Sequence, residues 1–326
     1  MEKTADKAKL PWAGHSLPLM LAPMQGLTNR ALRGLFAERY KPDVLFTEFV
    51  RVGKGKKNNI SANDRLEAAP GDSGLPLVVQ LIGNDREALG RAALLVQELG
   101  AVHLNINLGC PFGRMGSNSA GGSLLRDEEG LANILGGLRP LIAGSFSVKF
   151  RAGFDDPGQT LSLVKLFEDC GVDYLILHPR TVAQQYSGRA DHRITAEVVK
   201  ATGLPVIANG DIFTAAEGHR VLAQTGAAGL MLGRGAIGDP FLFARLRGNY
   251  PAVSTPEARR VEVREYLQEL LRRYQVLFCG ERQILAKMKD VIRQVTDPEL
   301  ATLVQRLKKS KTLLKFEEVL ADVDWD

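Results

Sequence analysis

Eight short apolar segments recur between residues 17 and 233, and this repetition constrains the fold more than any other feature of the sequence. Their central residues are almost continuously apolar, as expected for strands that are buried on both faces of a parallel sheet. Segments of helical length separate most of them. The eight segments are Leu17–Met24, Val44–Val50, Leu77–Gly83, Val102–Leu108, Phe146–Arg151, Tyr174–His178, Pro205–Gly210 and Gly229–Gly233.

The intervening segments have the periodicity of surface helices. In Arg86–Leu99, for example, apolar residues fall on one face of the predicted helix. The other predicted helices are Asp127–Leu138, Thr160–Cys170, Ile194–Ala201 and Ala215–Thr225. The glycines that follow helices, in the usual place of a C-terminal cap, are Gly100, Gly171, Gly203 and Gly226. Eight β-then-α units in about 240 residues predict a (β/α)8 TIM barrel. An open doubly wound sheet is the alternative, but it usually has fewer strands and a glycine-rich first turn.

The chain changes character after residue 247. Gly248–Pro256 has the composition of a linker, and three helical patterns without strands follow, at Arg259–Phe278, Arg282–Val295 and Pro298–Lys311. We therefore predict an N-terminal tail (1–16), a barrel (17–247) and a small C-terminal helical domain (248–326). This last region is rich in lysine and arginine, which fits either an ordinary solvated surface or a surface that faces RNA.

Composition narrows the class of protein. Apolar residues make up 45% of the chain and charged residues 24%, with a net charge of +5, as in an ordinary globular protein. No apolar run reaches the roughly 20 residues of a membrane span, and the N-terminus lacks an apolar signal core. We expect a cytoplasmic protein, and a monomer. Cys110, Cys170 and Cys279 are too few for a disulfide framework and show no metal-ligand spacing.

Polar residues gather where the predicted strands end, which is where barrel enzymes carry their active sites. Glycines and arginines at the last strands (Arg180, Gly210, Gly233 and Arg234) predict an anion site, because phosphates bind at these loops. Ordinary tight turns are the alternative. The other strand-end residues are Pro23, Met24, Gln25, Glu48, Arg51, Gln80, Asn105, Asn107, Cys110, Lys149, Arg151, His178, Asn209 and Asp211.

Lys149 and Cys110 are the strongest chemical candidates. Alternation along Ser147–Arg151 puts Lys149 and Arg151 on one face, and we expect that face to point into the barrel. An inward lysine there could stabilise a reduced flavin or form a Schiff base; an outward, solvated lysine is the other possibility. Cys110 lies in a Gly-Cys-Pro loop at the predicted mouth, where a thiol can do chemistry, whereas Cys170 and Cys279 fit buried apolar roles.

In this order, these motifs resemble the tRNA-dihydrouridine synthase family from about Leu19 to the C-terminal helices. The segments that carry the resemblance are Leu21–Met24, Thr47–Glu48, Val79–Gly83, Asn105–Pro111, Gly121–Leu125, Val148–Arg151, His178–Thr181, Ile207–Asp211 and Leu232–Gly235. Some positions depart from the family pattern: Asn105 replaces aspartate, Pro179 glycine, Arg114 lysine and His192 tryptophan. The run Thr47–Val52 is most similar to the bacterial C-type branch, which modifies uridine 16.

The resemblance implies a flavin mononucleotide (FMN) that reduces carbon 6 of a flipped-out uracil in tRNA, with NADPH as the reductant and Cys110 as the acid that protonates carbon 5. Asn107 would bind the uracil edge, and Arg51, Arg151, Arg180 and Lys287 would contact the substrate. The implied FMN-binding residues are Pro23, Met24, Gln25, Gln80, Lys149, His178, Asn209, Gly210, Asp211, Gly233 and Arg234.

Two other functions remain open from the residues alone. One is a flavin barrel that acts on a small pyrimidine such as dihydroorotate, and the other is an RNA-binding barrel without catalysis. The basic helical region distinguishes the first, since an enzyme with a small substrate does not need it. Cys110 and Lys149 argue against the second.

Overall fold

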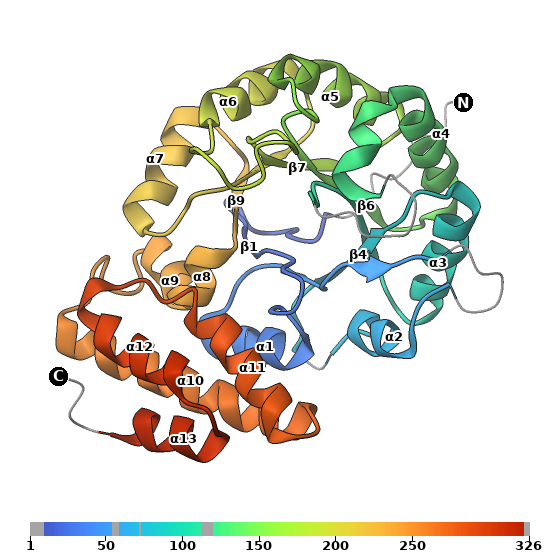
Figure 1. Cartoon of the computed structure of the whole chain (residues 1–326). Helices are drawn as coiled ribbons and strands as arrows, with labels where there is room; N and C mark the ends of the chain where they lie inside the picture. The colour runs from blue at the N-terminus through green and yellow to red at the C-terminus, as the bar shows by residue number, and fades with distance from the viewer. Residues whose placement is uncertain (1–9, 54–58, 72, 112–119, 323–326) are drawn as a thin grey trace.

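A parallel β-barrel surrounded by helices forms the centre of the protein (Figure 1). The computed structural model describes residues 10–53, 59–71, 73–111 and 120–322. The strands are β1 (Leu19–Leu21), β2 (Leu45–Phe46), β3 (Val50–Arg51), β4 (Leu77–Ile82), β5 (His103–Leu108), β6 (Ser145–Arg151), β7 (Tyr174–His178), β8 (Val206–Asn209) and β9 (Gly229–Leu232). All of their pairings are parallel, so the predicted TIM barrel is confirmed.

The second barrel strand is divided into two. We predicted one strand over Val44–Val50, but β2 and β3 are separate two-residue strands that both pair with β4. Closure of the barrel is correspondingly weak on this side, because β1 meets the second strand through a single bridge between Met20 and Val44. The pairing of β1 with β9 completes the ring and excludes the open doubly wound sheet.

Helices lie outside the ring. They are α1 (Arg30–Leu35), α2 (Ala62–Ala68), α3 (Arg86–Glu98), α4 (Glu128–Leu138), α5 (Thr160–Asp169), α6 (His192–Ala201), α7 (Ala215–Thr225), α8 (Arg234–Gly238), α9 (Leu242–Leu246), α10 (Pro256–Leu277), α11 (Glu281–Ile292), α12 (Ala301–Lys309) and α13 (Leu313–Ala321). Gly100, Gly171 and Gly226 have the positive φ of a helix cap, whereas Gly203 does not, because α6 ends in extended backbone at Thr202.

The barrel interior is apolar at the N-terminal end of the strands. Met20, Phe46, Ile176 and Met231 fill it together with Tyr174, which is fully buried. Trp12 closes this end with its ring edge-on to Tyr174, at a centroid distance of 4.7 Å. The part of the expected N-terminal tail around Trp12 therefore packs on the barrel. With one end of the barrel plugged, any site inside it must open at the other end.

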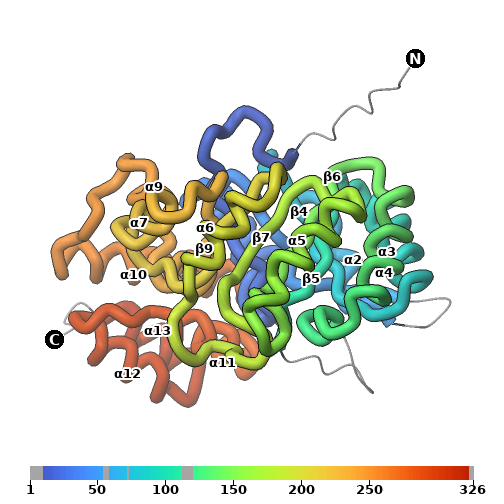
Figure 2. Tube along the Cα trace, turned by 90° about the horizontal axis from the view of Figure 1, so that it is seen from above, coloured from blue at the N-terminus to red at the C-terminus, as the bar shows by residue number. Residues whose placement is uncertain are grey.

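The C-terminal helices pack against one side of the barrel and share its core (Figure 2). Tyr266 of α10 lies edge-on to Phe36, with ring centroids 6.2 Å apart, and Leu270 and Tyr274 of the same helix are also fully buried. One apolar cluster runs from β1 and α1 to α13 without interruption. The helical region thus completes the wall of the barrel next to the short helix α8.

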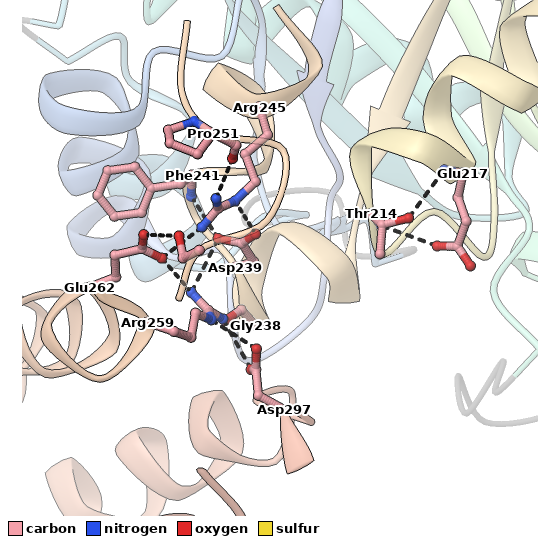
Figure 3. Close-up of polar contacts among 11 residues, drawn as sticks. Thr214, Glu217, Gly238, Asp239, Phe241, Arg245, Pro251, Arg259, Glu262 and Asp297 are labelled. Carbon is pink, nitrogen blue, oxygen red and sulfur yellow. Dashed lines mark hydrogen bonds and ion pairs between the residues drawn. The ribbon is translucent and has the colours of Figure 1, made fainter. Parts of the chain in front are cut away.

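A buried cluster of charges fastens α10 to the loop after α8 (Figure 3). Arg259 of α10 donates to both carboxylate oxygens of Asp297, at 2.8 and 3.1 Å, and to the carbonyl of Gly238 at 2.7 Å. Arg245 donates to Asp239 at 2.8 Å and to Glu262 at 2.7 Å. Two arginines therefore face three carboxylates where the barrel meets the helical region.

Candidate active site

A cavity of about 100 Å³ opens at the C-terminal end of the barrel strands. Loops and strand ends from β1, β6, β7, β8 and β9 form it. Nine of the residues predicted to bind a cofactor line it, namely Pro23, Met24, Lys149, His178, Asn209, Gly210, Asp211, Gly233 and Arg234. These residues are far apart in the sequence, and the barrel brings them to one place.

Glycine is required at one side of this cavity. Gly210 has a φ of +119°, and a Cβ atom there would lie 3.0 Å from Cδ2 of His178. Gly233 precedes α8, and a Cβ on it would approach the sulfur of Met24 at 3.4 Å. The Cβ contact at Gly233 is an ordinary van der Waals distance, whereas Gly210 lets backbone come close to whatever occupies the cavity, as the predicted anion site requires.

Lys149 points inward and lines the cavity, so the outward, solvated lysine is wrong. Its ammonium has no hydrogen-bonding partner among the residues that the structure describes. Burial, reinforced by the charge of Arg151, lowers the pKa of Lys149 to about 7, while the nearby Cys110 acts in the opposite direction. A negatively charged group bound in the cavity would raise this pKa again.

His178 is neutral and oriented. Burial lowers its pKa well below the usual value, and the charges of Lys149, Arg151, Arg180 and Arg234 act in the same direction. A guanidinium nitrogen of Arg180 lies 3.1 Å from its Nε2. Because arginine can only donate, Nε2 must accept, and the proton of the imidazole sits on Nδ1.

Arg180 has a positioning role. Its side chain is 3% exposed and forms a two-pronged ion pair with Asp211, at 3.0 and 2.6 Å. It also donates to the carbonyls of Ser187 and Gly188 in the loop after β7. Burial acts to raise the pKa of Asp211, but the hydrogen bonds from Arg180 and the Ala190 amide outweigh this effect. The pKa of Asp211 therefore lies below its usual value. The donors of Arg180 are thus engaged, and its contact with substrate stays a prediction.

Two aromatic residues that the sequence did not identify also line the cavity. Tyr186 and Phe213 follow β7 and β8 and are 52% and 38% exposed. The guanidinium of Arg234 lies over both rings, 5.1 and 5.5 Å from their centroids. Exposed aromatic side chains in the loops of a barrel mouth are a usable signal, since they offer flat surfaces for stacking.

A layer of amides lies beneath the mouth. Gln80 donates to Asn105 at 2.7 Å and accepts from Asn107 at 2.8 Å, and Asn105 donates to Ser147 at 2.8 Å. Gln80 is fully buried in this chain of hydrogen bonds and does not line the cavity. Its predicted contact with a cofactor is therefore untested, and its observed role is to orient Asn107.

Asn107 and Arg151 fix the loop that carries Cys110. The Asn107 Oδ1 atom accepts from the backbone amides of Gly109 and Cys110, at 3.0 and 2.9 Å. Nε of Arg151 donates to the carbonyl of Gly109 at 2.8 Å. Cys110 itself is half-buried. The thiol therefore sits on a loop whose backbone is held from two sides, beside the strand that carries Lys149.

Four other residues named from the sequence do not line this cavity. Gln25 lines a different cavity, and its contact with a cofactor stays a prediction. Lys287 of α11 donates to the carbonyl of Gly26 at 2.8 Å, which gives it a partner within the chain. Arg51 is exposed, with Phe49 beneath its guanidinium at 5.2 Å. Cys279 is exposed rather than buried, because it lies in the turn between α10 and α11. Arg114 lies outside the described residues.

Within the described ranges, no group of three or more His, Cys, Asp or Glu side chains is arranged to hold a metal ion. Among the helices of that same part of the chain, none combines the length and the apolar character that crossing a membrane requires.

Comparison with known proteins matches the barrel and helical region together. The family model described as dihydrouridine synthase matches residues 20–321. The tRNA-dihydrouridine synthase B of Pseudomonas aeruginosa is 35% identical over 276 residues, which cover 82% of this chain and 80% of that protein. The tRNA-dihydrouridine(16) synthase of Cupriavidus necator is 31% identical over 311 residues, 93% and 96% of the two chains.

Among solved structures, morphinone reductase matches with a TM-score of 0.54 and 13% identity, over 77% of this chain and 91% of that one, which shows a shared barrel fold. The sequence resemblance is thus confirmed over nearly the whole chain: this protein belongs to the dihydrouridine synthase family.

Proposed function

We propose that this protein is an FMN-dependent tRNA-dihydrouridine synthase that reduces a uridine of tRNA to 5,6-dihydrouridine at the expense of NADPH. The observation that carries the proposal is the pairing of a fixed cysteine loop, at Cys110, with the cavity around Lys149 in a chain of this family. Such a reaction takes place where tRNA is found, which fits the cytoplasmic location expected from the sequence.

The residues around the cavity fit a flavin mononucleotide. An unpartnered buried cation, Lys149, suits the electron-rich end of a reduced flavin. Gly210, Gly233 and Arg234 offer close backbone approach and a positive charge to a phosphate. The cavity of about 100 Å³ holds only part of such a molecule, and the remainder would lie along the mouth near Tyr186. Bound FMN would supply the hydride that reduces carbon 6 of the uracil.

Cys110 would supply the proton. Its loop lies at the same end of the barrel as the cavity. Asn107, which is hydrogen-bonded to Gln80 and to the Cys110 amide, pairs with Lys149 on the neighbouring strand and so holds the loop beside it. A thiol in this position would donate to carbon 5 as a general acid. Asn107 would hold the uracil edge and Tyr186 would stack on the flipped base, because the ring is exposed at the mouth.

The substrate class follows from the relatives. The proteins from P. aeruginosa and C. necator are both named for dihydrouridine in tRNA, and the match to the second spans almost the full length of both chains. Helices α10–α13 share the core of the barrel, so the choice of tRNA over a small pyrimidine rests on these relatives. An RNA-binding barrel without catalysis would have no use for a buried Lys149. Modification of uridine 16 stays a prediction.

Mapping dihydrouridine in tRNA from a strain that lacks this protein tests the proposal. We expect dihydrouridine to be lost at one position and to return when purified protein, NADPH and FMN are added to that tRNA. Unchanged dihydrouridine in the deletion strain, together with no activity of the purified protein on its tRNA, would refute the proposed reaction. The position that is lost tests the prediction of uridine 16.

A further inference from the structure

A second cavity lies on the other side of the loop after β1. It has a volume of about 480 Å³ and is formed by this loop, helix α2 and the turn between α10 and α11. Met24 lines the cavity that contains Lys149, and the next residue, Gln25, lines this one. The two cavities are therefore neighbours. The volume of the second is within the range of about 300–1,000 Å³ that is usual for small-ligand sites.

The charge of this second cavity disfavours phosphate. Its carboxylates are Glu48, Asp64 and Glu67, and its cations are Arg30 and Lys287. Both cations are already engaged. Arg30 donates to Glu67 at 3.1 Å, and Lys287 donates to the Gly26 carbonyl at 2.8 Å. Glu67 is also paired with the buried Arg33 at 2.9 Å. A phosphate would therefore have to compete with Glu67 and the Gly26 carbonyl for the described cations, whereas a neutral group would be accepted.

The unpartnered polar groups of the second cavity suit the edge of a nucleobase. The side chains of Gln25, Asn63 and Gln283 and the carboxylate of Asp64 have no hydrogen-bonding partner among the residues that the structure describes. Amides both donate and accept, and a carboxylate accepts from the amino group of a base. Phe278 adds an aromatic surface on the side of α10.

We propose that the second cavity binds another nucleobase of the same tRNA, one that carries an exocyclic amino group, while the target uridine enters the cavity of Lys149. This inference rests on the proposed function. Asp64 accepts from the amino group, and the amides of Asn63 and Gln283 pair with the rest of the base edge. The second cavity thereby sets which uridine reaches the neighbouring one.

The variant Asp64→Asn tests this inference because two explanations of the role of Asp64 predict opposite changes in the strength of tRNA binding. It keeps the shape of the side chain but turns an acceptor oxygen into a donor amide. If Asp64 only contributed negative charge, its removal would strengthen tRNA binding. If Asp64 accepts from a base, the KM for tRNA rises about tenfold while kcat stays within about twofold of the unaltered protein. Glu98→Gln, on an exposed residue at the end of α3, removes the same charge outside the cavity and leaves KM unchanged.

A binding readout separates this inference from the proposed reaction. Cys279 is exposed and lines the second cavity, so alkylation by iodoacetamide, mapped by mass spectrometry, reports on its occupancy. We expect tRNA to protect Cys279 in the full-length protein and to protect it less in Asp64→Asn, with Cys170 as the internal reference. This measurement needs no turnover, and it stands even if no dihydrouridine is formed. A KM that is unchanged or lower in Asp64→Asn, or a Cys279 that tRNA leaves unprotected, would overturn the inference.

Discussion

Lys149 makes the stability of the flavin-free protein depend on pH in a direction that can be calculated. Burial lowers its pKa from 10.5 to about 7 in the folded chain. Between pH 7 and pH 9 the unfolded chain therefore keeps a proton that the folded chain has lost, so the free energy of unfolding rises with pH. Integrating over this interval gives a gain of about 2 kcal/mol that Lys149→Met lacks.

Urea unfolding of the flavin-free proteins at pH 7 and pH 9 measures this difference directly. We expect the wild type to gain about 2 kcal/mol relative to Lys149→Met, since all other titrating groups are common to both. Lys200→Met is the matched control, because Lys200 is exposed on α6, and it should follow the wild type. With FMN bound, the pH dependence should diminish, because a nearby negative charge raises the pKa of Lys149. A difference between wild type and Lys149→Met that is the same at both pH values would refute a lowered pKa at this residue.

Four further variants test other parts of the structure. Cys110→Ala should bind FMN and tRNA but form dihydrouridine about 10²–10⁴-fold more slowly in single-turnover oxidation of the reduced flavin, and a normal rate would remove Cys110 from the acid role. Arg234→Ala should lose flavin on purification, visible as lost yellow absorbance; full flavin content would place the phosphate elsewhere. Arg259→Met should lower the free energy of unfolding by about 3–5 kcal/mol, and Glu262→Gln by less, because only the first leaves three carboxylates facing one arginine. If chemical denaturation showed the same loss of unfolding free energy for Arg259→Met and Glu262→Gln, this argument from the charge balance would be contradicted.

The barrel was predictable because its strands are buried on both faces and therefore appear as apolar runs. The strand Tyr174–His178 and the helix Ala215–Thr225 begin and end where the sequence placed them. The division of the second strand was not predictable, since two-residue strands leave almost no periodicity. Helix α13 was not predicted, because the last predicted helical pattern ended at Lys311, whereas Leu313, Phe316 and Leu320 of the following segment are buried against the other C-terminal helices.

The cavity was predictable to the extent that strand ends converge in a barrel. Nine cofactor residues assigned from separate motifs line one cavity, whereas Gln25 lies on the far side of its loop. What sequence could not give was the use of each side chain. Arg151 and Arg180 carry charges that suggest an anion or substrate contact, yet they donate hydrogen bonds to Gly109 and Asp211, respectively, within the chain. Which donors remain free depends on loop geometry that no motif encodes.

The shared core decides how the role of the helical region can be tested. The sequence suggested a separate helical domain after residue 247. Tyr266 and Tyr274 are instead fully buried in the cluster that contains Phe36 and Phe243 of the barrel, and Arg259 is tied to the Gly238 carbonyl. Cutting at this boundary would expose that cluster to water and cost far more than the marginal stability of a folded protein, about 5–15 kcal/mol. Loss of activity after such a deletion would report unfolding. Single side chains at the junction, such as the half-buried Asp64 and the exposed Gln283, can separate RNA recognition from folding because these side chains make no hydrogen bonds within the described chain.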